Sequence, residues 1–296
     1  MREMIREVIV AVDLEGTAEQ QVLAKRLTKL GVMLAHWTDS QLRLFSATEE
    51  NDPEHREKER RLNALAEAAS SQARCTVWLG SSINELLKLK RRGGVVAELL
   101  VAGLRGHGRT ELALHGSVSE ALLQHTSRPV VLLGPAFQDF QESKPLLYVA
   151  TDLTNESRAA EWYARSLAKR LKTGIKLFHS LWPTIRSLEE GIALAGSVTE
   201  EQRVDLEEAL SDAEKRIRAK AEWIERSGVS CDWRIDVSRE SLADILAREN
   251  ISQPALLFMG GGNRGPMMTR LLGSTVRDVA MKSSIPIVAV HRSKSC

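Results

Sequence analysis

A long internal repeat constrains the fold of this chain more than any other feature of its sequence. Short apolar runs, amphipathic runs and a glycine-rich stretch occur in the same order in both halves. The matching positions are Asp13 and Asp152, Phe45 and Phe178, Gly103 and Gly260, and Gly116 and Gly273. Recurrence of a whole series of elements indicates a tandem duplication. Whatever fold the first half adopts, we expect the second half to adopt as well.

In the first half, apolar runs typical of buried strands alternate with amphipathic runs typical of helices. The expected strands cover 8–12, 41–47, 74–79, 99–102 and 129–133, and the expected helices cover 18–36, 53–72, 82–91 and 118–126. Strands that alternate with helices in this way form a parallel sheet with helices on both faces. The expected fold class is therefore α/β, with two doubly wound parallel-sheet domains in tandem.

The segment over 134–145 has no periodicity and contains glycine, two prolines and polar residues, so we place the linker there. One domain is expected over residues 1–136 and a second over residues 145–296. The chain has 296 residues, which is comfortable for two domains of ordinary size.

The two copies are not equally long. The offset between matching positions is 139 at Asp13, 133 at Phe45 and 157 at Gly103. The second copy is therefore shortened early and lengthened in its middle, over 181–200 and a longer helix that follows. The inserted stretch suits a lid, a partner contact or a plain surface loop.

Composition argues against several classes of function. Lys and Arg number 41 against 39 Asp and Glu, so the net charge of +2 gives no electrostatic case for nucleic acid. The tryptophans, such as Trp162 and Trp223, stand at positions expected in the core. No apolar stretch approaches the roughly 18 residues of a membrane span, and the N-terminus lacks a signal-peptide pattern. Three scattered cysteines favour a reduced compartment. We expect a cytoplasmic protein without a resident metal site.

The glycine-rich stretch that follows the fourth expected strand has the composition of a phosphate-binding loop. Gly103 stands where a strand ends and offers bare backbone to a ligand, and Gly106 allows a turn that directs successive amides toward one point. Gly116 and Ser117 precede a helix whose first amides attract an anion, and Glu120 completes a capping box with Ser117. A lone motif of this kind is as often a turn that binds nothing. Its occurrence twice in one chain favours a function.

The spacing Gly-x2-Gly-x9-Gly-Ser, met by Gly103, Gly106, Gly116 and Ser117, resembles the nucleotide-binding signature of the universal stress protein family. The first strand ending in Asp13, the Ser-Val-Ser-Glu helix start and the closing Arg-Pro-Val-Val-Leu-Leu strand are similar to that family too. The resemblance covers nearly the whole chain, as two copies. It implies a Rossmann-like, adenine nucleotide alpha hydrolase-like fold for each half, packed as a pseudo-dimer. It also implies ATP as the ligand, with or without Mg²⁺.

The resemblance further implies residue roles, with adenine near Val12 and Asp13 and the phosphates on the loop. Asp13 is equally well explained as a turn residue at the end of a strand. Arg105 would add charge-assisted contacts. The residues expected to contact the nucleotide in the first half are Val12, Asp13, Gly103, Arg105, Gly106, Gly116, Ser117, Val118 and Ser119.

The second copy departs from this signature. Asn263 stands where the middle glycine is expected, although asparagine tolerates the left-handed backbone well. The helix start has no capping-box acid and carries Arg277 near the positive end of the helix dipole. We expect nucleotide binding there to be weaker or absent. The corresponding positions are Asp152, Gly260, Asn263, Gly273 and Ser274.

We therefore expect a nucleotide-binding stress-response protein that acts on an unidentified protein partner by binding, and not by turnover. No P-loop lysine and no evident general base accompany the loop. The alternatives are a slow ATPase or another nucleotide-dependent enzyme that uses the same loop, and a structural pseudo-dimer with two vestigial sites. The closing strands over 130–133 and 287–290 suit either pairing within the chain or a homodimer.

Overall fold

The computed structural model describes residues 5–14, 18–48, 51–70, 73–80, 85–86, 97–104, 118–126, 128–137, 143–182, 184–187, 200–238, 240–248, 255–261 and 274–291. The elements of the first half are β1 (Ile5–Ala11), α1 (Ala18–Thr38), β2 (Gln41–Ala47), α2 (His55–Ser70), β3 (Cys75–Gly80), β4 (Ala97–Gly103), α4 (Val118–His125) and β5 (Val130–Leu133). Those of the second half are β6 (Leu146–Ala150), α5 (Arg158–Leu171), β7 (Ile175–Ser180), α7 (Glu200–Glu225), β8 (Cys231–Asp236), α8 (Leu242–Arg248), β9 (Ala255–Gly261), α9 (Ser274–Lys282) and β10 (Ile287–His291).

The expected α/β alternation is confirmed in both halves, and the described element ends of the first half lie within three residues of the expected ones. The strand β2 and the start of α4 at Val118 lie where the sequence placed them. Most of the helix expected over 82–91 lies outside the described residues, although Glu85 and Leu86 are helical.

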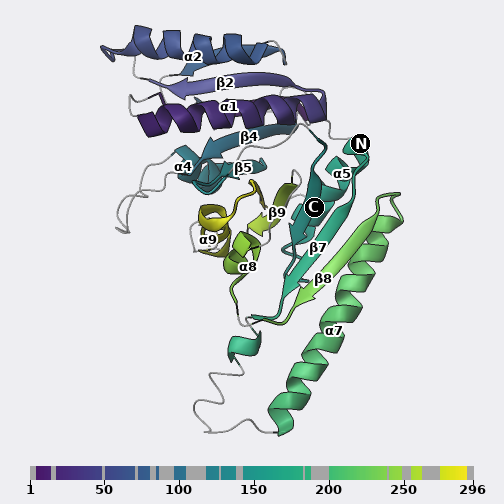
Figure 1. Cartoon of the computed structure of the whole chain (residues 1–296). Coiled ribbons are helices and arrows are strands. Elements are labelled where there is room, and N and C mark those ends of the chain that lie inside the picture. The colour runs from purple at the N-terminus through teal and green to yellow at the C-terminus, as the bar shows by residue number, and fades with distance from the viewer. Residues whose placement is uncertain are drawn as a thin grey trace.

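All ten strands form one sheet in the order β3-β2-β1-β4-β5-β10-β9-β6-β7-β8. The strands are parallel within each half. The halves join through β5 and β10, which pair antiparallel with Val131 opposite Val288. Of the two arrangements open to the closing strands, the structure therefore contains the pairing within the chain. Figure 1 shows the resulting pseudo-dimer, with α2 and α7 at opposite ends.

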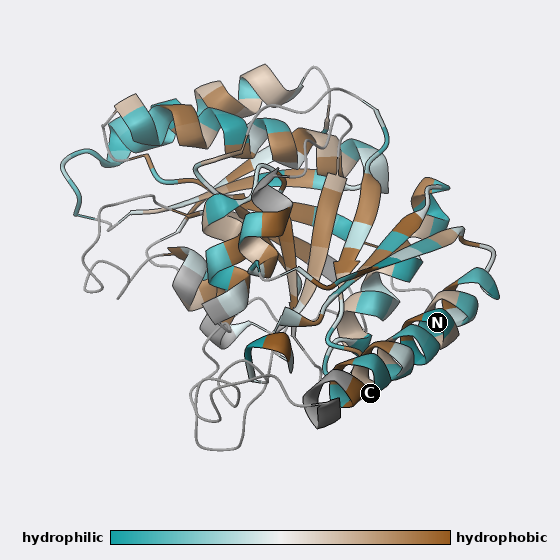
Figure 2. Ribbon diagram, turned by 60° about the horizontal axis from the view of Figure 1, so that its bottom comes forward, coloured by the Kyte–Doolittle hydropathy of each residue, from teal (hydrophilic) through white to brown (hydrophobic). Residues whose placement is uncertain are grey.

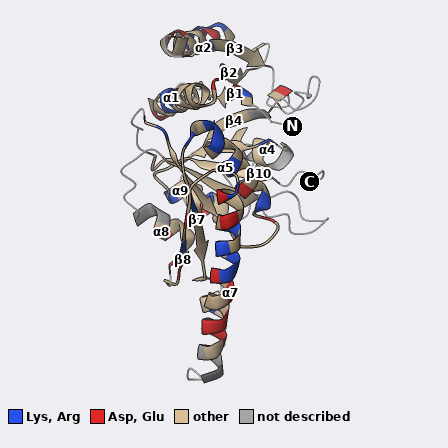
Figure 3. Cartoon of the chain, turned by 90° about the vertical axis from the view of Figure 1, so that its right-hand side faces the viewer, with Lys and Arg blue, Asp and Glu red and all other residues tan. Residues whose placement is uncertain are grey.

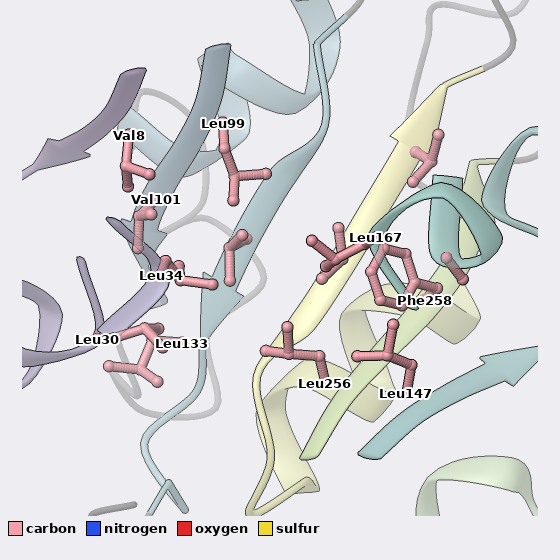
Figure 4. Packing of buried hydrophobic residues seen from close by; sticks show 14 of the residues in the cluster. Val8, Leu30, Leu34, Leu99, Val101, Leu133, Leu147, Leu167, Leu256 and Phe258 are labelled. Carbon is pink, nitrogen blue, oxygen red and sulfur yellow. The ribbon is translucent and has the colours of Figure 1, made fainter. Parts of the chain in front are cut away.

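The sheet is buried on both faces by separate hydrophobic clusters. The helices α1, α2, α5 and α7 contribute to one cluster, and α4, α8 and α9 contribute to the other. Figure 4 shows side chains from both halves on the first face, including Val101 and Leu133 from one half and Leu256 and Phe258 from the other. Continuous apolar strands are typical of a parallel sheet covered on both sides, and Figure 2 shows this in the hydrophobic colour of the central strands.

Arg170 ties the two halves together where the C-terminal ends of α1 and α5 approach each other. Its guanidinium donates to the carbonyl oxygen of Thr38 and, at 3.5 Å, to that of Ile5. A cation at the C-terminus of a helix complements the negative end of the helix dipole. The matching position in the first half is Trp37, so this contact has no symmetric counterpart of the same kind.

The length differences expected from the offsets appear in the helices. α1 has 21 residues and α5 has 14, whereas α2 has 16 and α7 has 26. Figure 1 shows α7 continuing past the end of β8, and Figure 3 shows acidic and basic residues along it. The core position expected for Trp162 was wrong, because this side chain is 37% exposed. Trp223 is partly buried, with the Arg165 guanidinium 3.7 Å from its ring centroid.

Asp52 fixes the entry into α2 and gives a testable pH dependence. Its carboxylate accepts hydrogen bonds from Lys58 Nζ at 2.6 Å, Glu54 N at 2.8 Å and Thr48 Oγ1 at 3.0 Å. These partners, Lys58 first, lower the pKa of Asp52 from 3.8 to about 2. A lowered folded-state pKa stabilises the fold above the unfolded pKa, and the contribution is lost as the pH falls through about 2.

We expect Asp52→Asn to lower the urea midpoint of unfolding at pH 5 and to have a smaller effect near pH 2.5. The variant lacks the charge but keeps an oxygen that accepts hydrogen bonds, so the difference isolates ionisation. Urea titrations of both proteins at the two pH values measure it. An equal difference at both pH values would contradict this account of Asp52.

Candidate functional site

The ends of β1 and β4 lie side by side in the middle of the first half of the sheet. Ala11 is in register with Ala102, so the next positions along each strand, Val12 and Gly103, lie opposite each other. The chain leaves β1 toward α1 on one face and leaves β4 toward α4 on the other. Strand order reverses at this point, and open α/β sheets bind ligands in the crevice that such a reversal creates.

Main-chain and side-chain contacts hold this edge in place. Val12 N donates to Phe45 O at 2.8 Å. The side chain of Asp13 is half-buried, and Gln20 Nε2 from the first turn of α1 lies 3.5 Å from its Oδ2. The Cα of Gly103 faces Leu23, whose Cδ2 would stand 2.8 Å from a Cβ added there. A glycine is therefore the residue that fits between α1 and the end of β4 without a shift of Leu23.

The helix α4 begins 15 positions after Gly103, as the loop spacing predicted. Val118 is half-buried and Ser119 is 2% exposed. The other expected loop contacts, Arg105, Gly106, Gly116 and Ser117, lie outside the described residues. Their roles and those of the neighbouring positions stay predictions.

The second half repeats the geometry of this edge. Ala150 is in register with Met259, which places Thr151 opposite Gly260. Thr151 N donates to Phe178 O at 2.9 Å, the counterpart of the bond from Val12. Asp152 follows Thr151, and Ser274 is the first residue of α9. Asn263 and Gly273 lie outside the described residues.

The segment above this second edge differs from its counterpart. The residue of the second half that matches Leu23 is Glu156, and it belongs to the short connection between β6 and α5 instead of to a helix. A Cβ added at Gly260 would lie 3.0 Å from Glu156 O and 3.2 Å from the Cα of Ser157. Backbone therefore borders Gly260, where the first half has the flexible end of a leucine side chain.

A buried polar network holds this connection down. Glu161, 2% exposed, accepts from Lys220 Nζ at 2.7 and 2.9 Å. Its Oε1 also accepts from Thr151 Oγ1 at 2.8 Å and Ser157 Oγ at 3.0 Å. Leu153, with a left-handed φ of 61°, donates its N–H to Thr151 Oγ1 at 3.0 Å. A buried carboxylate needs such partners, because leaving it unpaired is costly.

The described residues of the first half do not repeat this network. The positions that match Thr151, Ser157 and Glu161 are Val12, Ala24 and Thr28, and the Thr28 hydroxyl donates to Ala24 O at 2.8 Å within its own helix. Sequence reasoning missed these residues of the second half. The available signal was an acid, Glu161, on the apolar face of α5.

The pKa values of two groups at this edge are lowered. The shift favours the ionised form of the Asp152 carboxyl and the neutral form of the His179 imidazole. Partial burial opposes ionisation of Asp152, but hydrogen bonds from Thr154 N at 2.9 Å and Thr154 Oγ1 at 2.8 Å outweigh it and leave the pKa lowered. Burial lowers the pKa of His179, against the opposing effect of the hydrogen bond between its Nδ1 and Thr151 O at 2.8 Å. Asp152 is thus ionised but already paired within its own loop.

Metal-binding chemistry and cavities add little to this picture. Among the described residues there is no group of three or more His, Cys, Asp or Glu side chains that would hold a metal ion. An open depression of about 450 Å³ lies at the amino ends of β6, β7 and β8, between Tyr148, Lys176 and Glu225. It is at the opposite end of these strands from the crevice.

None of the helices in the described part of the chain is both long and apolar enough to cross a membrane.

Comparison with known proteins gives one consistent result. The sequence profile of the universal stress protein family matches residues 4–134 and 145–291. The universal stress protein Rv2623 of Mycobacterium tuberculosis is 27% identical over 200 residues, which are 67% of this chain and 62% of that protein. A universal stress protein of Mycolicibacterium smegmatis is 26% identical over 196 residues, 66% of this chain and 62% of its own. The matched part thus spans less than two thirds of these relatives.

Solved structures agree on the fold. A universal stress protein from Archaeoglobus fulgidus superposes with a TM-score of 0.61 at 20% identity, covering 97% of this chain and 98% of its own. A protein of unknown function from Pseudomonas aeruginosa superposes with a TM-score of 0.55 at 15% identity, covering 98% and 94%. Similarity at these identities concerns the fold and extends over both halves.

Proposed function

Because the chain belongs to the universal stress protein family, with two matched segments in tandem, we propose that it is a stress-response protein that binds ATP at the first of its two crevices. The observation that carries the proposal is the register of Ala11 with Ala102, which brings the ends of β1 and β4 side by side at the reversal of strand order. The glycine-rich spacing starts at that glycine and leads to α4.

The residues of the first crevice suit an adenine nucleotide. Val12 and Asp13 end the central strand β1 and would border the adenine or ribose, as the family resemblance implies. The bare backbone at Gly103 and the loop amides before Val118 would meet the phosphates. Phosphate groups bring negative charge, which the N-terminus of α4 favours. Any Mg²⁺ would arrive with the nucleotide and share its phosphate oxygens.

The second crevice is proposed to bind nucleotide weakly or not at all. Backbone from Glu156 and Ser157 lies against Gly260, and the Glu161–Lys220 network holds that connection in place. Asp152 already accepts two hydrogen bonds from Thr154. A nucleotide would have to displace these internal contacts, which lowers its affinity. This agrees with the departures from the glycine pattern at Asn263 and Arg277.

We further propose that the protein acts by binding and not by turnover. ATP would order the loop and α4 and so change the surface offered to a protein partner, since a ligand shifts conformations only through contacts that differ between states. The phosphate-binding stretch supplies glycines, arginines and hydroxyls, and its sequence lacks the lysine of a P-loop. Such a cradle holds phosphate without activating a water molecule.

The test is the nucleotide content of freshly purified protein, released by acid and separated by anion exchange, with added ATP followed for hours on the same column. We expect intact ATP that is not consumed. If the protein converts ATP to ADP and the Gly116→Glu variant does not, the protein is an ATPase and not a regulator that acts by binding alone. Protein that neither contains nor takes up nucleotide would contradict the proposal as a whole.

A further inference from the structure

The two ends of the ten-stranded sheet are equivalent strands of the repeat with different surface chemistry. β3 forms one end and β8 forms the other. The sequence of β3 is Cys-Thr-Val-Trp-Leu-Gly, without a charge, and that of β8 is Cys-Asp-Trp-Arg-Ile-Asp. Edge strands are commonly protected from pairing by charged residues, and an uncharged apolar edge favours pairing with another strand.

The hydrogen-bonding groups of β3 that face outward follow from its pairing with β2. Leu42 N donates to Arg74 O at 2.9 Å, and Thr48 N donates to Gly80 O at 2.8 Å. In a parallel ladder alternate residues direct both their N–H and C=O groups to the same neighbour. The even-numbered residues therefore face β2. The main-chain groups of Cys75, Val77 and Leu79 face the side where, among the described residues, the sheet has no further strand.

At the other end of the sheet, the odd-numbered residues of β8 likewise direct their main-chain groups outward, but the exposed side chains differ from those of β3. Ile175 N donates to Ser230 O at 2.9 Å and Leu181 N to Asp236 O at 2.9 Å, so Trp233 is the outward counterpart of Val77. Asp232 and Arg234 on either side of it are exposed charges, whereas Val77 is an exposed valine at 38%. Over the described residues, the edge strand of the second copy thus carries protecting charges and the edge strand of the first copy carries none.

The seam inside the molecule shows how this repeat joins two copies. β5 and β10 are uncharged apolar strands over their paired residues, and they pair antiparallel through a register of three residue pairs centred on Val131 and Val288. An antiparallel pair of two β3 strands is self-complementary in the same way. With Val77 opposite its own copy, Cys75 of each chain lies opposite Leu79 of the other, and the outward groups exchange hydrogen bonds in pairs.

We propose that β3 is a homodimer interface, at which β3 pairs antiparallel with β3 of a second copy about a twofold axis at Val77. The two sheets then form one continuous sheet, and the charged β8 strands remain at its ends. A contact made by one short edge strand on each side is small. The dimer is therefore expected to be reversible and to depend on protein concentration.

The first test is sedimentation velocity of the full chain over a range of concentrations, without nucleotide and with ATP. We expect a monomer–dimer equilibrium that Val77→Lys weakens at least tenfold, because two ammonium groups then face each other across the axis. A second variant, Cys75→Pro, removes an outward amide from β3. Its matched control is Cys231→Pro, which makes the equivalent change in β8. We expect Cys75→Pro to weaken the dimer and Cys231→Pro to leave it unchanged.

The second test detects the dimer directly, by cross-linking, and so does not rely on a variant that weakens it. In a chain whose three cysteines are replaced by serine, Val77→Cys is expected to form a disulfide dimer under mild oxidation, because a hydrogen-bonded pair places the two Cα atoms about 5.5 Å apart. Val237→Cys, at a 55% exposed position near β8, is expected to remain monomeric. A chain that is monomeric throughout, or a dimer that Val77→Lys leaves intact and Val77→Cys does not cross-link, would overturn the proposal.

Discussion

Replacing Gly116 with glutamate is expected to abolish ATP binding by the whole chain, whereas the same replacement at Gly273 is expected to leave it unchanged. Gly116 stands two positions before α4. A carboxylate there would lie beside the phosphates, and like charges brought together cost several kcal/mol, or about 100-fold or more in affinity. Calorimetric titration of nucleotide-free protein with ATP measures the change.

The two variants control for each other, because they place the same side chain at matching positions of the two copies. Circular dichroism and the urea midpoint of each variant would establish that the fold is retained. Loss of binding in Gly273→Glu with retention in Gly116→Glu would reverse the assignment of the crevices. An equal partial loss in both would mean that both halves bind.

Replacing Lys220 with methionine is expected to destabilise the protein by about 3–5 kcal/mol, the usual cost of removing one partner of a buried ion pair. Glu161 is 2% exposed, and Lys220 is its only charged partner among the hydrogen bonds found in the described residues. Methionine keeps the length and apolar stem of the lysine but leaves the buried carboxylate with two hydroxyl partners and no positive charge. The free energy of unfolding from urea titration gives the cost.

The matched control is Arg226→Met, which breaks the 3.5 Å pair between Glu222 of α7 and Arg226, the residue that follows this helix, where the side chains are 54% and 76% exposed. Exposed pairs of this kind contribute about 0–1 kcal/mol. The double variant Glu161→Met with Lys220→Met is expected to recover much of the loss, because apolar replacement of a whole buried pair is often neutral. Equal effects of Lys220→Met and Arg226→Met would contradict the structural role given to the network.

The fold was predictable because its determinants are local and repeated. Apolar runs of strand length and amphipathic runs of helix length identified the elements, and the repeat required the same order twice. Contacts between distant residues were not predictable in this way. Arg170 contacts Thr38 across 132 positions of the sequence, and Lys220 contacts Glu161 across 59. No local sequence pattern at Arg170 or Lys220 predicts which residue it will contact. Trp162 was misplaced because helix periodicity alone does not say how deeply a large side chain is covered.

The site was predictable to the level of its strand ends. The registers of Ala11 with Ala102 and of Ala150 with Met259 bring the expected strand ends side by side in each half, whereas the nucleotide contacts assigned to these residues stay predictions. Weaker nucleotide binding at the second crevice was expected from the replacement of one glycine by Asn263 and from a missing capping-box acid, and it stays a prediction. The structure adds a difference that those positions did not contain, namely a short connection after β6 whose backbone lies against Gly260. The position of this connection depends on packing against α7, through the contact of Glu161 with Lys220. These two residues are 59 positions apart in the sequence.

The most direct test of the central claim is the number of ATP molecules that one chain binds. The chain is stripped of nucleotide, its concentration is determined independently, and ATP is titrated to saturation with equilibrium dialysis as a second method. The account predicts one molecule of ATP per chain. Two molecules per chain with similar affinity would show that the connection over Gly260 does not close the second crevice, and would contradict the account.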